Sequence, residues 1–344
     1  GGARRPLIVA GLGLEPQKPY GALLDLAEAL QAPVIVTPKA KGAFPADHPL
    51  AAGTFGLTGY DPPYELADEA DCIVAVGFDV VEMESLWDQP QPMIWIAPWA
   101  NEEPRLTTVE FELVGPLAPI LERLAVFAAA NYEPASGWGE ARVKTHRERK
   151  ALNANRLPEA APGRMRPQTV FDVLRRNVAR DAIVTTDTGS HKIAMALMWP
   201  AYVPNTYLLS NGLSSMGYGL PAAIAAARMT ERTTLCVTGD GGLAMALGEL
   251  GLLAELDLPV IVVVMNDNAL DLIRSGQRRR GKPVFGTEFE NPDYEAIAHG
   301  FGLVFYRVTD EETCAGALRA ATAGEGPTLI EAMIDPSSYP TTPR

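Results

Sequence analysis

Gly239-Asp240-Gly241-Gly242 stands at a change of periodicity in the chain, and Met265-Asn266-Asp267-Asn268 stands at the next one. Thr233 to Thr238 is rich in β-branched and apolar residues, and Leu243 to Glu255 has helical periodicity. Leu258 to Met265 is almost wholly apolar. This order predicts a strand, a helix and a second strand parallel to the first. The crossover places both acidic motifs at the carboxyl ends of neighbouring strands, where open α/β sheets bind ligands.

The two motifs suit a phosphate and a hard cation. Gly241 and Gly242 leave backbone N–H groups accessible to an anion at the start of a helix. Asp240 and Asp267 supply carboxylate oxygens, and the carbonyl of Ala269 adds a third ligand of the kind Mg²⁺ prefers beside ligand phosphates and water. The glycine tetrapeptide alone is also typical of an ordinary loop. The second acidic position one crossover later favours a metal–diphosphate clamp.

These two segments resemble the cofactor-binding signature of thiamine diphosphate enzymes, in the branch that includes acetolactate synthase and the 2-oxo acid decarboxylases. Thr186-Asp187-Thr188-Gly189-Ser190-His191 resembles the family's diphosphate-contacting loop, and the resemblance places Ser190 and His191 on the diphosphate. By itself, His191 is also typical of a surface or helix-capping residue. The resemblance implies thiamine diphosphate and Mg²⁺ as cofactors.

Asn211 to Pro221 resembles the segment beneath the cofactor rings. Met216 matches the bulky apolar residue that holds the cofactor bent, although methionine is also an ordinary core residue. Ser214 stands where a glycine is usual, and its carbonyl is expected to accept from the cofactor amino group. Leu270 to Gln277 predicts a helix after the metal loop. In it, Leu270, Ile273 and Gln277 are weaker candidates for a substrate pocket, and core packing explains them equally well.

The first part of the chain predicts another sheet flanked by helices. Apolar strand patterns and one amphipathic helix alternate there, at Leu7–Ala10, Tyr20–Leu30, Pro33–Thr37, Cys72–Gly77 and Met93–Ala97. The predicted fold class is therefore α/β, with two doubly wound domains, each a mostly parallel sheet flanked by helices. The expected divisions are residues 1–130, a linker at 131–165 with one exposed helix, and residues 166–344.

Gly11 and Gly13 suggest a dinucleotide-binding turn, but the third glycine of that fingerprint is missing. Thr37 to Leu50, followed by Gly53 and Gly56, instead resembles the central domain of the same enzymes. Some members bind flavin in that domain. Gly77 to Glu82 departs from the flavin-binding acetolactate synthases, so FAD is not predicted.

Composition excludes several other classes of protein. The formal net charge of −13 argues against nucleic-acid binding, and the basic cluster Lys144, Arg147, Arg149 and Lys150 is expected to be a solvated helix face. Arg278 to Arg280 are likewise expected to be a solvated run, with contact to an acidic substrate as the alternative. The apolar runs are far shorter than the roughly 20 residues of a membrane span. Three dispersed cysteines favour reduced thiols and a cytoplasmic location.

The resembling enzymes also carry an amino-terminal domain of about 150–200 residues. That domain binds the aminopyrimidine and supplies the glutamate that promotes deprotonation of the thiazolium. The sequence shows no counterpart, so no catalytic residue is predicted on this chain and it is expected to be inactive alone. Its Gly1-Gly2 start favours a fragment of a longer enzyme over a separate partner polypeptide.

For the intact enzyme, the resemblance implies decarboxylation of a 2-oxo acid, with the product either protonated or joined to a second carbonyl compound. It also implies a homodimer or tetramer, because the cofactor lies between domains of two subunits. Two alternatives come from other classes. One is an NAD-binding module that uses the amino-terminal sheet, and the other is a non-catalytic subunit that binds thiamine diphosphate.

Overall fold

The computed structural model describes residues 2–58, 62–84, 87–102, 106, 108–154, 157–324 and 326–339. The chain divides into two compact units. The first contains Gly1–Arg156 and the short segment Pro200–Asn205, and the second contains Leu157–Trp199 and Thr206–Thr342. The division between them thus falls within the stretch 131–165 predicted as a linker.

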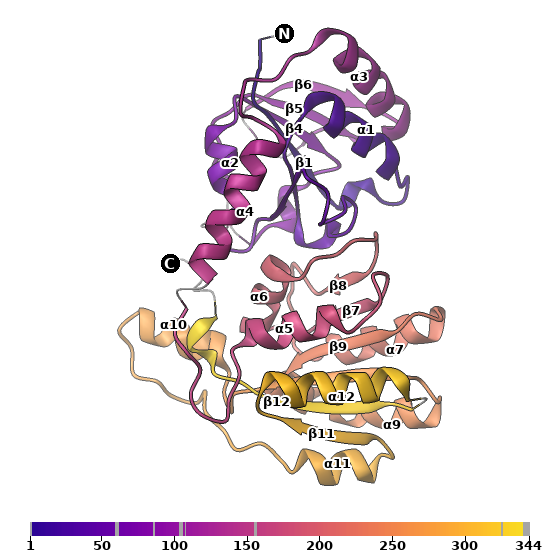
Figure 1. Cartoon of the computed structure of the whole chain (residues 1–344), viewed down its shortest axis with the longest axis vertical. Helices are drawn as coiled ribbons and strands as arrows, with labels where there is room; N and C mark the ends of the chain where they lie inside the picture. Colours follow the sequence, from indigo (N-terminus) through magenta and orange to yellow (C-terminus); the bar gives the residue numbers. More distant parts are fainter. Residues whose placement is uncertain are drawn as a thin grey trace. The chain divides into compact units, whose positions relative to one another are not determined.

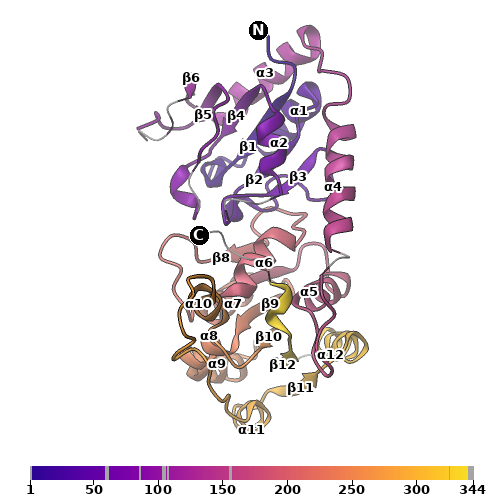
Figure 2. The same cartoon turned by 90° about the vertical axis from the view of Figure 1, so that its left-hand side faces the viewer.

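The first unit is built on a parallel six-stranded sheet in the order β3-β2-β1-β4-β5-β6 (Figures 1 and 2). Its strands are β1 (Pro6–Ala10), β2 (Val34–Val36), β3 (Ala51–Thr54), β4 (Cys72–Val76), β5 (Met93–Ala97) and β6 (Val109–Val114). Its helices are α1 (Tyr20–Leu30), α2 (Tyr64–Glu69), α3 (Leu117–Asn131) and α4 (Glu140–Ala154). Short 3₁₀ turns follow three strands: η1 (Leu12–Leu14), η2 (Pro38–Ala40) and η3 (Val80–Glu82).

The central strand β1 is buried on both faces of this sheet. Ile8 and Ala10 belong to the core formed with α1 and α3, whereas Leu7 and Val9 belong to the core formed with α2 and α4. Because side chains alternate along a strand, one apolar run serves both cores. This explains why the pattern of β1 is continuous rather than alternating.

Helix α4 is the helix predicted in the linker. Its Val143 and His146 are buried, and Arg147 donates to the carbonyls of His48 and Ala51 over 2.7 Å. The helix is therefore packed on the first unit rather than exposed on all sides. The buried face of α4 could not be predicted from its run of charged residues, because a long basic side chain can donate either to water or to backbone carbonyls within the protein.

The second unit is built on a parallel six-stranded sheet in the order β11-β12-β10-β9-β7-β8. Figure 2 shows β9, β10 and β12 side by side. Its strands are β7 (Ile183–Thr186), β8 (Tyr207–Leu209), β9 (Thr234–Gly239), β10 (Val260–Asn266), β11 (Val304–Val308) and β12 (Thr328–Met333). Its helices are α5 (Pro167–Arg176), α6 (Ser190–Met198), α7 (Gly219–Met229), α8 (Asp240–Met245), α9 (Leu250–Glu255), α10 (Asp271–Arg279), α11 (Tyr294–Gly300) and α12 (Glu311–Ala323), with 3₁₀ turns η4 (Leu247–Glu249) and η5 (Pro336–Ser338).

Strand β10 lies inside this sheet, and all of its residues are buried. Val260, Val262 and Val264 form a core with α7, α9 and α11 on one face. The helices α5 and α12 pack together elsewhere on the unit. The predicted α/β fold with two doubly wound parallel sheets is confirmed.

The helix predicted over Leu243–Glu255 is wrong as a single element. The chain forms α8, the turn η4 and then α9. Gly248 and Gly251 lie in this stretch, and glycine lowers helix propensity by about 1 kcal/mol relative to alanine. The helix predicted at Leu270–Gln277 is observed as α10, shifted by one or two residues. None of the described helices combines the length and the apolar character that crossing a membrane requires.

Candidate functional site

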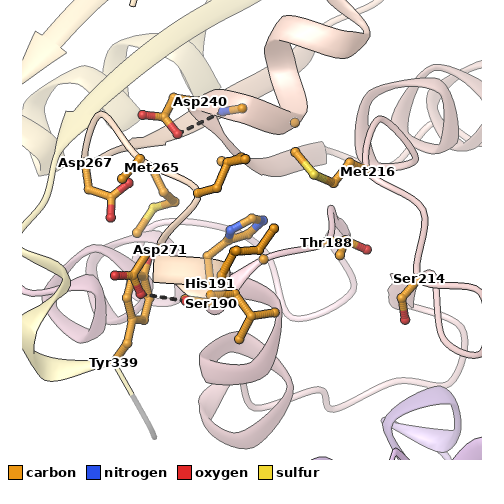
Figure 3. A pocket seen from close by; sticks show the side chains of 18 residues that line it. Thr188, Ser190, His191, Ser214, Met216, Asp240, Met265, Asp267, Asp271 and Tyr339 are labelled. Carbon is orange, nitrogen blue, oxygen red and sulfur yellow. Dashed lines mark hydrogen bonds between the residues drawn. The ribbon is translucent and has the colours of Figure 1, made fainter. Parts of the chain in front are cut away.

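A cavity of about 220 Å³ lies in the second unit, where β7, β9 and β10 end (Figure 3). All nine residues that the sequence analysis assigned to the cofactor or the metal line this cavity: Ser190, His191, Ser214, Met216, Asp240, Gly241, Gly242, Asp267 and Ala269. They come from four separate segments of the chain. Neighbouring parallel strands bring these segments to one edge of the sheet.

Asp240 is the first residue of α8 and is 2 % exposed. Its Oδ1 accepts from the backbone N–H of Gly241 over 2.8 Å. Its Oδ2 accepts from the N–H of Asn268 over 2.8 Å and from the amide of Asn291 over 2.9 Å. Burial raises the pKa of Asp240 above its ordinary value, and these donors oppose that rise. Asp240 thus connects the end of β9 to the turn that follows β10.

Asp267, rather than Asn266, faces the cavity. The side chain of Asn266 is turned away, where it donates to Glu331 over 2.6 Å and accepts from Asn291 over 2.9 Å. Asn268 adopts φ +58°, in the left-handed region that asparagine tolerates better than most residues. Asn268 thus reverses the chain directly after Asp267.

Arg274 on α10 joins two carboxylates at this end of the cavity. Its Nη2 lies 3.2 Å from Asp267 Oδ2 and 3.0 Å from Asp271 Oδ1. Burial is the main cause that raises the pKa of Asp267 to about 7; repulsion from Asp240 and Asp271 adds to it, and Arg274 opposes it. The site therefore concentrates negative charge that a bound cation would stabilise.

Ser190 and His191 begin helix α6. The Ser190 hydroxyl donates to Asp271 Oδ2 over 2.7 Å. His191 is 4 % exposed, and its Nε2 has no hydrogen-bond partner among the described residues. Burial is the main cause that lowers the pKa of His191 to about 4, so the ring is neutral near pH 7. A buried ring nitrogen without a partner at a cavity wall is suited to a polar ligand.

Asp187 fixes the position of this loop. Its Oδ1 accepts from the backbone of Thr188 over 2.7 Å. Its Oδ2 accepts from the backbone of Gly217 over 3.0 Å and from the Thr238 hydroxyl over 3.2 Å. One buried carboxylate thus connects three separate segments around the cavity. The sequence alone predicted no role for Asp187.

Ser214 and Met216 lie away from the carboxylates, as Figure 3 shows. Ser214 has φ +49°, a left-handed conformation that glycine adopts at lower cost, which is consistent with a glycine at this position in the resembling enzymes. The Lys192 ammonium donates to the Ser214 hydroxyl over 2.9 Å. Met216 is half-buried and lines the cavity.

Two polar residues at this cavity were missed from the sequence. Asp271 starts α10, and Tyr339 follows the turn η5. Spacing offered a weak signal for Asp271, four positions after Asp267, and none for Tyr339. Of the weaker candidates, Leu270 and Ile273 line the cavity. Gln277 does not, since its side chain bonds the backbone of Phe285.

The donor set fits a diphosphate held through a divalent cation. Two carboxylates and a backbone carbonyl are oxygen ligands of the kind that Mg²⁺ accepts. The partnerless His191 Nε2 and the glycine turn at the start of α8 lie in the same cavity. In the described part of the chain, no group of three or more His, Cys, Asp or Glu side chains is arranged to hold a metal by itself. A metal here would thus depend on ligand oxygens to complete its coordination.

Comparison with known families gives two matches. Residues 187–332 match the family described as thiamine pyrophosphate enzyme, C-terminal TPP binding domain. Residues 1–124 match the family described as thiamine pyrophosphate enzyme, central domain. Thiamine pyrophosphate is another name for thiamine diphosphate.

Individual relatives agree with these matches. The chain is 30 % identical over 96 % of its length to YdaP of Bacillus subtilis (strain 168), which is named provisionally as a thiamine pyrophosphate-containing protein. It is 31 % identical over 99 % of its length to the acetolactate synthase large subunit of Parasynechococcus marenigrum (strain WH8102). It is 29 % identical, again over 99 %, to the acetolactate synthase isozyme 1 large subunit of Escherichia coli (strain K12). The chain spans 57 %, 56 % and 61 % of these relatives, respectively.

Proposed function

Since the chain belongs to the thiamine pyrophosphate enzymes, of which it has the central and C-terminal domains, we propose that its second unit binds thiamine diphosphate through Mg²⁺ for an acetolactate synthase-like reaction on a 2-oxo acid. The observation that carries the proposal is the convergence of nine predicted residues on one cavity.

Each part of the cavity has a distinct role in this proposal. Asp240, Asp267 and the carbonyl of Ala269 hold the metal. Ser190, His191 and the backbone of the Gly241-Gly242 turn hold the diphosphate, because the start of a helix favours an anion. Because the neutral His191 ring carries one proton, the tautomer with the proton on Nε2 is the one that donates to an anion.

At the opposite end of the cavity, Met216 supports the cofactor rings and the Ser214 carbonyl accepts from the cofactor amino group. When bound, the cofactor supplies a nucleophilic carbon and an electron sink for loss of carbon dioxide from a 2-oxo acid. The chain contributes binding, orientation and exclusion of water. The two-carbon or longer fragment left after loss of carbon dioxide would then be protonated to an aldehyde or joined to a second carbonyl compound.

We also propose that the activating glutamate belongs to a pyrimidine-binding domain outside residues 1–344, on the same polypeptide or another. In support, no glutamate is among the described residues that line the cavity, and the carboxylates of Asp240, Asp267 and Asp271 lie away from Met216 and Ser214 (Figure 3). An assembly of two or four subunits would bring that domain to the cavity. The buried, unpaired cysteines Cys72, Cys236 and Cys314 support a reducing, cytoplasmic location.

Calorimetric titration of thiamine diphosphate, with Mg²⁺ and then with EDTA, tests the binding proposal. We expect Mg²⁺-dependent binding that Asp267→Ala weakens at least about tenfold, whereas Asp267→Asn retains one oxygen ligand and loses less. Asp240→Ala should weaken thiamine diphosphate binding more than Asp267→Ala does. Circular dichroism checks that the Asp240→Ala variant is folded. Equal affinity in EDTA, or in both alanine variants, would remove the clamp assignment.

Three further measurements separate the alternatives. NAD is titrated in the same way. Binding of NAD without Mg²⁺ would favour the alternative in which the first unit is an NAD-binding module. Release of carbon dioxide from pyruvate by the pure chain would contradict the external position of the activating acid. Tight thiamine diphosphate binding without turnover in the presence of any pyrimidine-binding domain would favour the non-catalytic subunit.

A further inference from the structure

The first unit has the strand order of a dinucleotide-binding domain. In the order β3-β2-β1-β4-β5-β6, successive strands are added on one side of β1 up to β3 and on the other side from β4 onwards, although all strands run parallel. The switch point between β1 and β4 is where open α/β sheets place nucleotides. Gly11, Leu12 and Gly13 follow β1 at this crevice, and Gly77 follows β4. The crevice thus has the position of a nucleotide site without the third glycine of the fingerprint.

The carboxyl group of Glu82 fills this crevice. Glu82 is 4 % exposed and ends the turn η3, a few residues beyond β4. Its Oε1 accepts from the backbone N–H of Leu12 over 2.9 Å, and its Oε2 accepts from the Thr37 hydroxyl over 2.6 Å. Leu12 follows β1 and Thr37 follows β2. One carboxyl group therefore takes donors from the ends of two neighbouring strands, where a phosphate would be bound in a nucleotide site.

Close contacts of Gly11 and Gly13 with other parts of the chain also fill the crevice. The Gly13 N–H donates to the carbonyl of Gly77 over 2.8 Å. A Cβ on Gly11 would lie 2.5 Å from the Gly77 carbonyl oxygen and 2.8 Å from Glu82 Oε1. A Cβ on Gly13 would lie 2.4 Å from the ring of Trp99. These glycines are thus needed for contact with the protein's own groups, rather than for the approach of a pyrophosphate.

We propose that Glu82 is a built-in occupant of the nucleotide crevice, and that it excludes NAD, FAD and ADP from the first unit. Its carboxyl group uses the hydrogen-bond donors that a nucleotide phosphate would need. The backbone of Gly11 and Gly13, which a pyrophosphate would have to approach, already lies against Gly77 and Trp99. The crevice is therefore specific for a carboxyl group that the chain itself supplies. This inference concerns the first unit only and does not depend on the cofactor site of the second.

Replacement of the carboxyl group by a free carboxylic acid tests the proposal. In Glu82→Ala, the Leu12 N–H and the Thr37 hydroxyl lose their acceptor beside a space the size of acetate. We expect sodium acetate to raise the melting temperature of this variant saturably, by about 2–4 °C over sodium chloride at equal ionic strength. The wild type and Glu110→Ala, which removes an exposed carboxyl from β6, should respond equally to both salts.

Two results would overturn the proposal. One is binding of NAD, FAD or ADP by the wild-type chain in calorimetry with EDTA and no Mg²⁺, where the proposed diphosphate site of the second unit lacks its cation, since Glu82 would then have been displaced. The other is an acetate response in Glu82→Ala no larger than in Glu110→Ala. If Glu82→Ala does not fold in chloride, its soluble yield on refolding with and without acetate gives the same comparison. Glu82→Gln keeps the side-chain volume. We expect this variant to fold, to have the same melting temperature in acetate and in chloride, and to bind no nucleotide.

Discussion

The guanidinium of Arg274 lies 3.2 Å from the carboxylate of Asp267, and the two side chains are 10 % and 5 % exposed. One of the two acids proposed to hold Mg²⁺ therefore already has a cationic partner within the protein. The same guanidinium also forms an ion pair with Asp271. Asp240 is bonded to backbone and amide donors rather than to a cation. The three cavity carboxylates thus outnumber the one arginine, and this excess of negative charge favours a divalent cation.

Removal of this internal cation should make the second unit more dependent on metal. We expect Arg274→Met to lower stability by about 3–5 kcal/mol without metal, because it leaves buried carboxylates without their partner. Mg²⁺ should then raise the melting temperature of the variant more than that of the wild type. Differential scanning fluorimetry with and without Mg²⁺ measures both effects. Arg278→Met, an exposed arginine on the same helix, is the control; an equal Mg²⁺ response in both variants would contradict the prediction.

The partnerless Nε2 of His191 predicts a selective loss of diphosphate binding. His191→Asn retains a polar group near the ring's Nδ1 and removes Nε2 from the cavity. A hydrogen bond to a charged group contributes about 1.5–3 kcal/mol, so we expect affinity for thiamine diphosphate to fall about 10- to 100-fold. Thiamine, which has no phosphate, should bind the variant and the wild type equally in calorimetry. A parallel loss of both ligands would indicate a structural role for His191 instead.

The sequence was sufficient to predict the cavity residues that lie next to a strand end or in a recognisable motif. Asp240 and Asp267 each come directly after an apolar strand, and the parallel pairing of β9 with β10 determines their proximity. The residues that were missed depend on longer paths. Tyr339 reaches the cavity only because the chain returns after β12, and no local pattern encodes that return.

Asp187 and Glu82 show a second limit of the sequence. Each is a buried carboxyl group whose partners come from separate loops, at Gly217 and Thr238 in one case and at Leu12 and Thr37 in the other. Composition and periodicity treat an acidic residue as a surface residue. Only the folded chain shows that these two groups are enclosed by donors. The buried face of the charged helix α4 could not be predicted for the same reason, because it depends on packing against residues far away in the sequence.

The adjacent glycines of the Gly241-Gly242 turn should respond differently to the same substitution. A Cβ at Gly241 would lie 2.7 Å from Cδ2 of Leu270, the end of a flexible side chain. A Cβ at Gly242 would lie 2.5 Å from Oδ2 of Asp187, which is held by other loops. We expect Gly242→Ala to lower the free energy of unfolding by about 1–3 kcal/mol, and Gly241→Ala by less. Gly241→Ala should mainly weaken ligand binding, because Leu270 moves within the cavity.

Urea unfolding and calorimetry of the two alanine variants separate these effects. Greater loss of stability in Gly241→Ala than in Gly242→Ala would contradict the contacts described here. Equal ligand affinity in Gly241→Ala and the wild type would show that Leu270 moves away from the ligand.

Lys41 predicts a dependence of stability on pH in the first unit. It is 7 % exposed, and its ammonium donates to the Thr54 hydroxyl over 2.9 Å. Burial, with a smaller contribution from Lys150, lowers the pKa of Lys41 to about 7, from 10.5 for an ordinary lysine. Between these two values the unfolded chain binds more protons than the folded chain. The contribution of Lys41 to the free energy of unfolding therefore increases as the pH rises from about 7 towards 10.5.

Lys41→Met removes this titration while retaining a long side chain. From pH 7 to pH 8.5, the free energy of unfolding of the wild type minus that of Lys41→Met should rise by about 1–2 kcal/mol. Urea unfolding followed by tryptophan fluorescence suits this measurement, because four of the five tryptophans, all except Trp199, belong to the first unit. Other titrating groups cancel in the difference, and Lys144→Met, at an exposed position on α4, controls for the loss of a charge. A difference that stays constant over this range would mean that Lys41 keeps its proton in the folded protein, and that its neighbours stabilise the buried ammonium more than burial destabilises it.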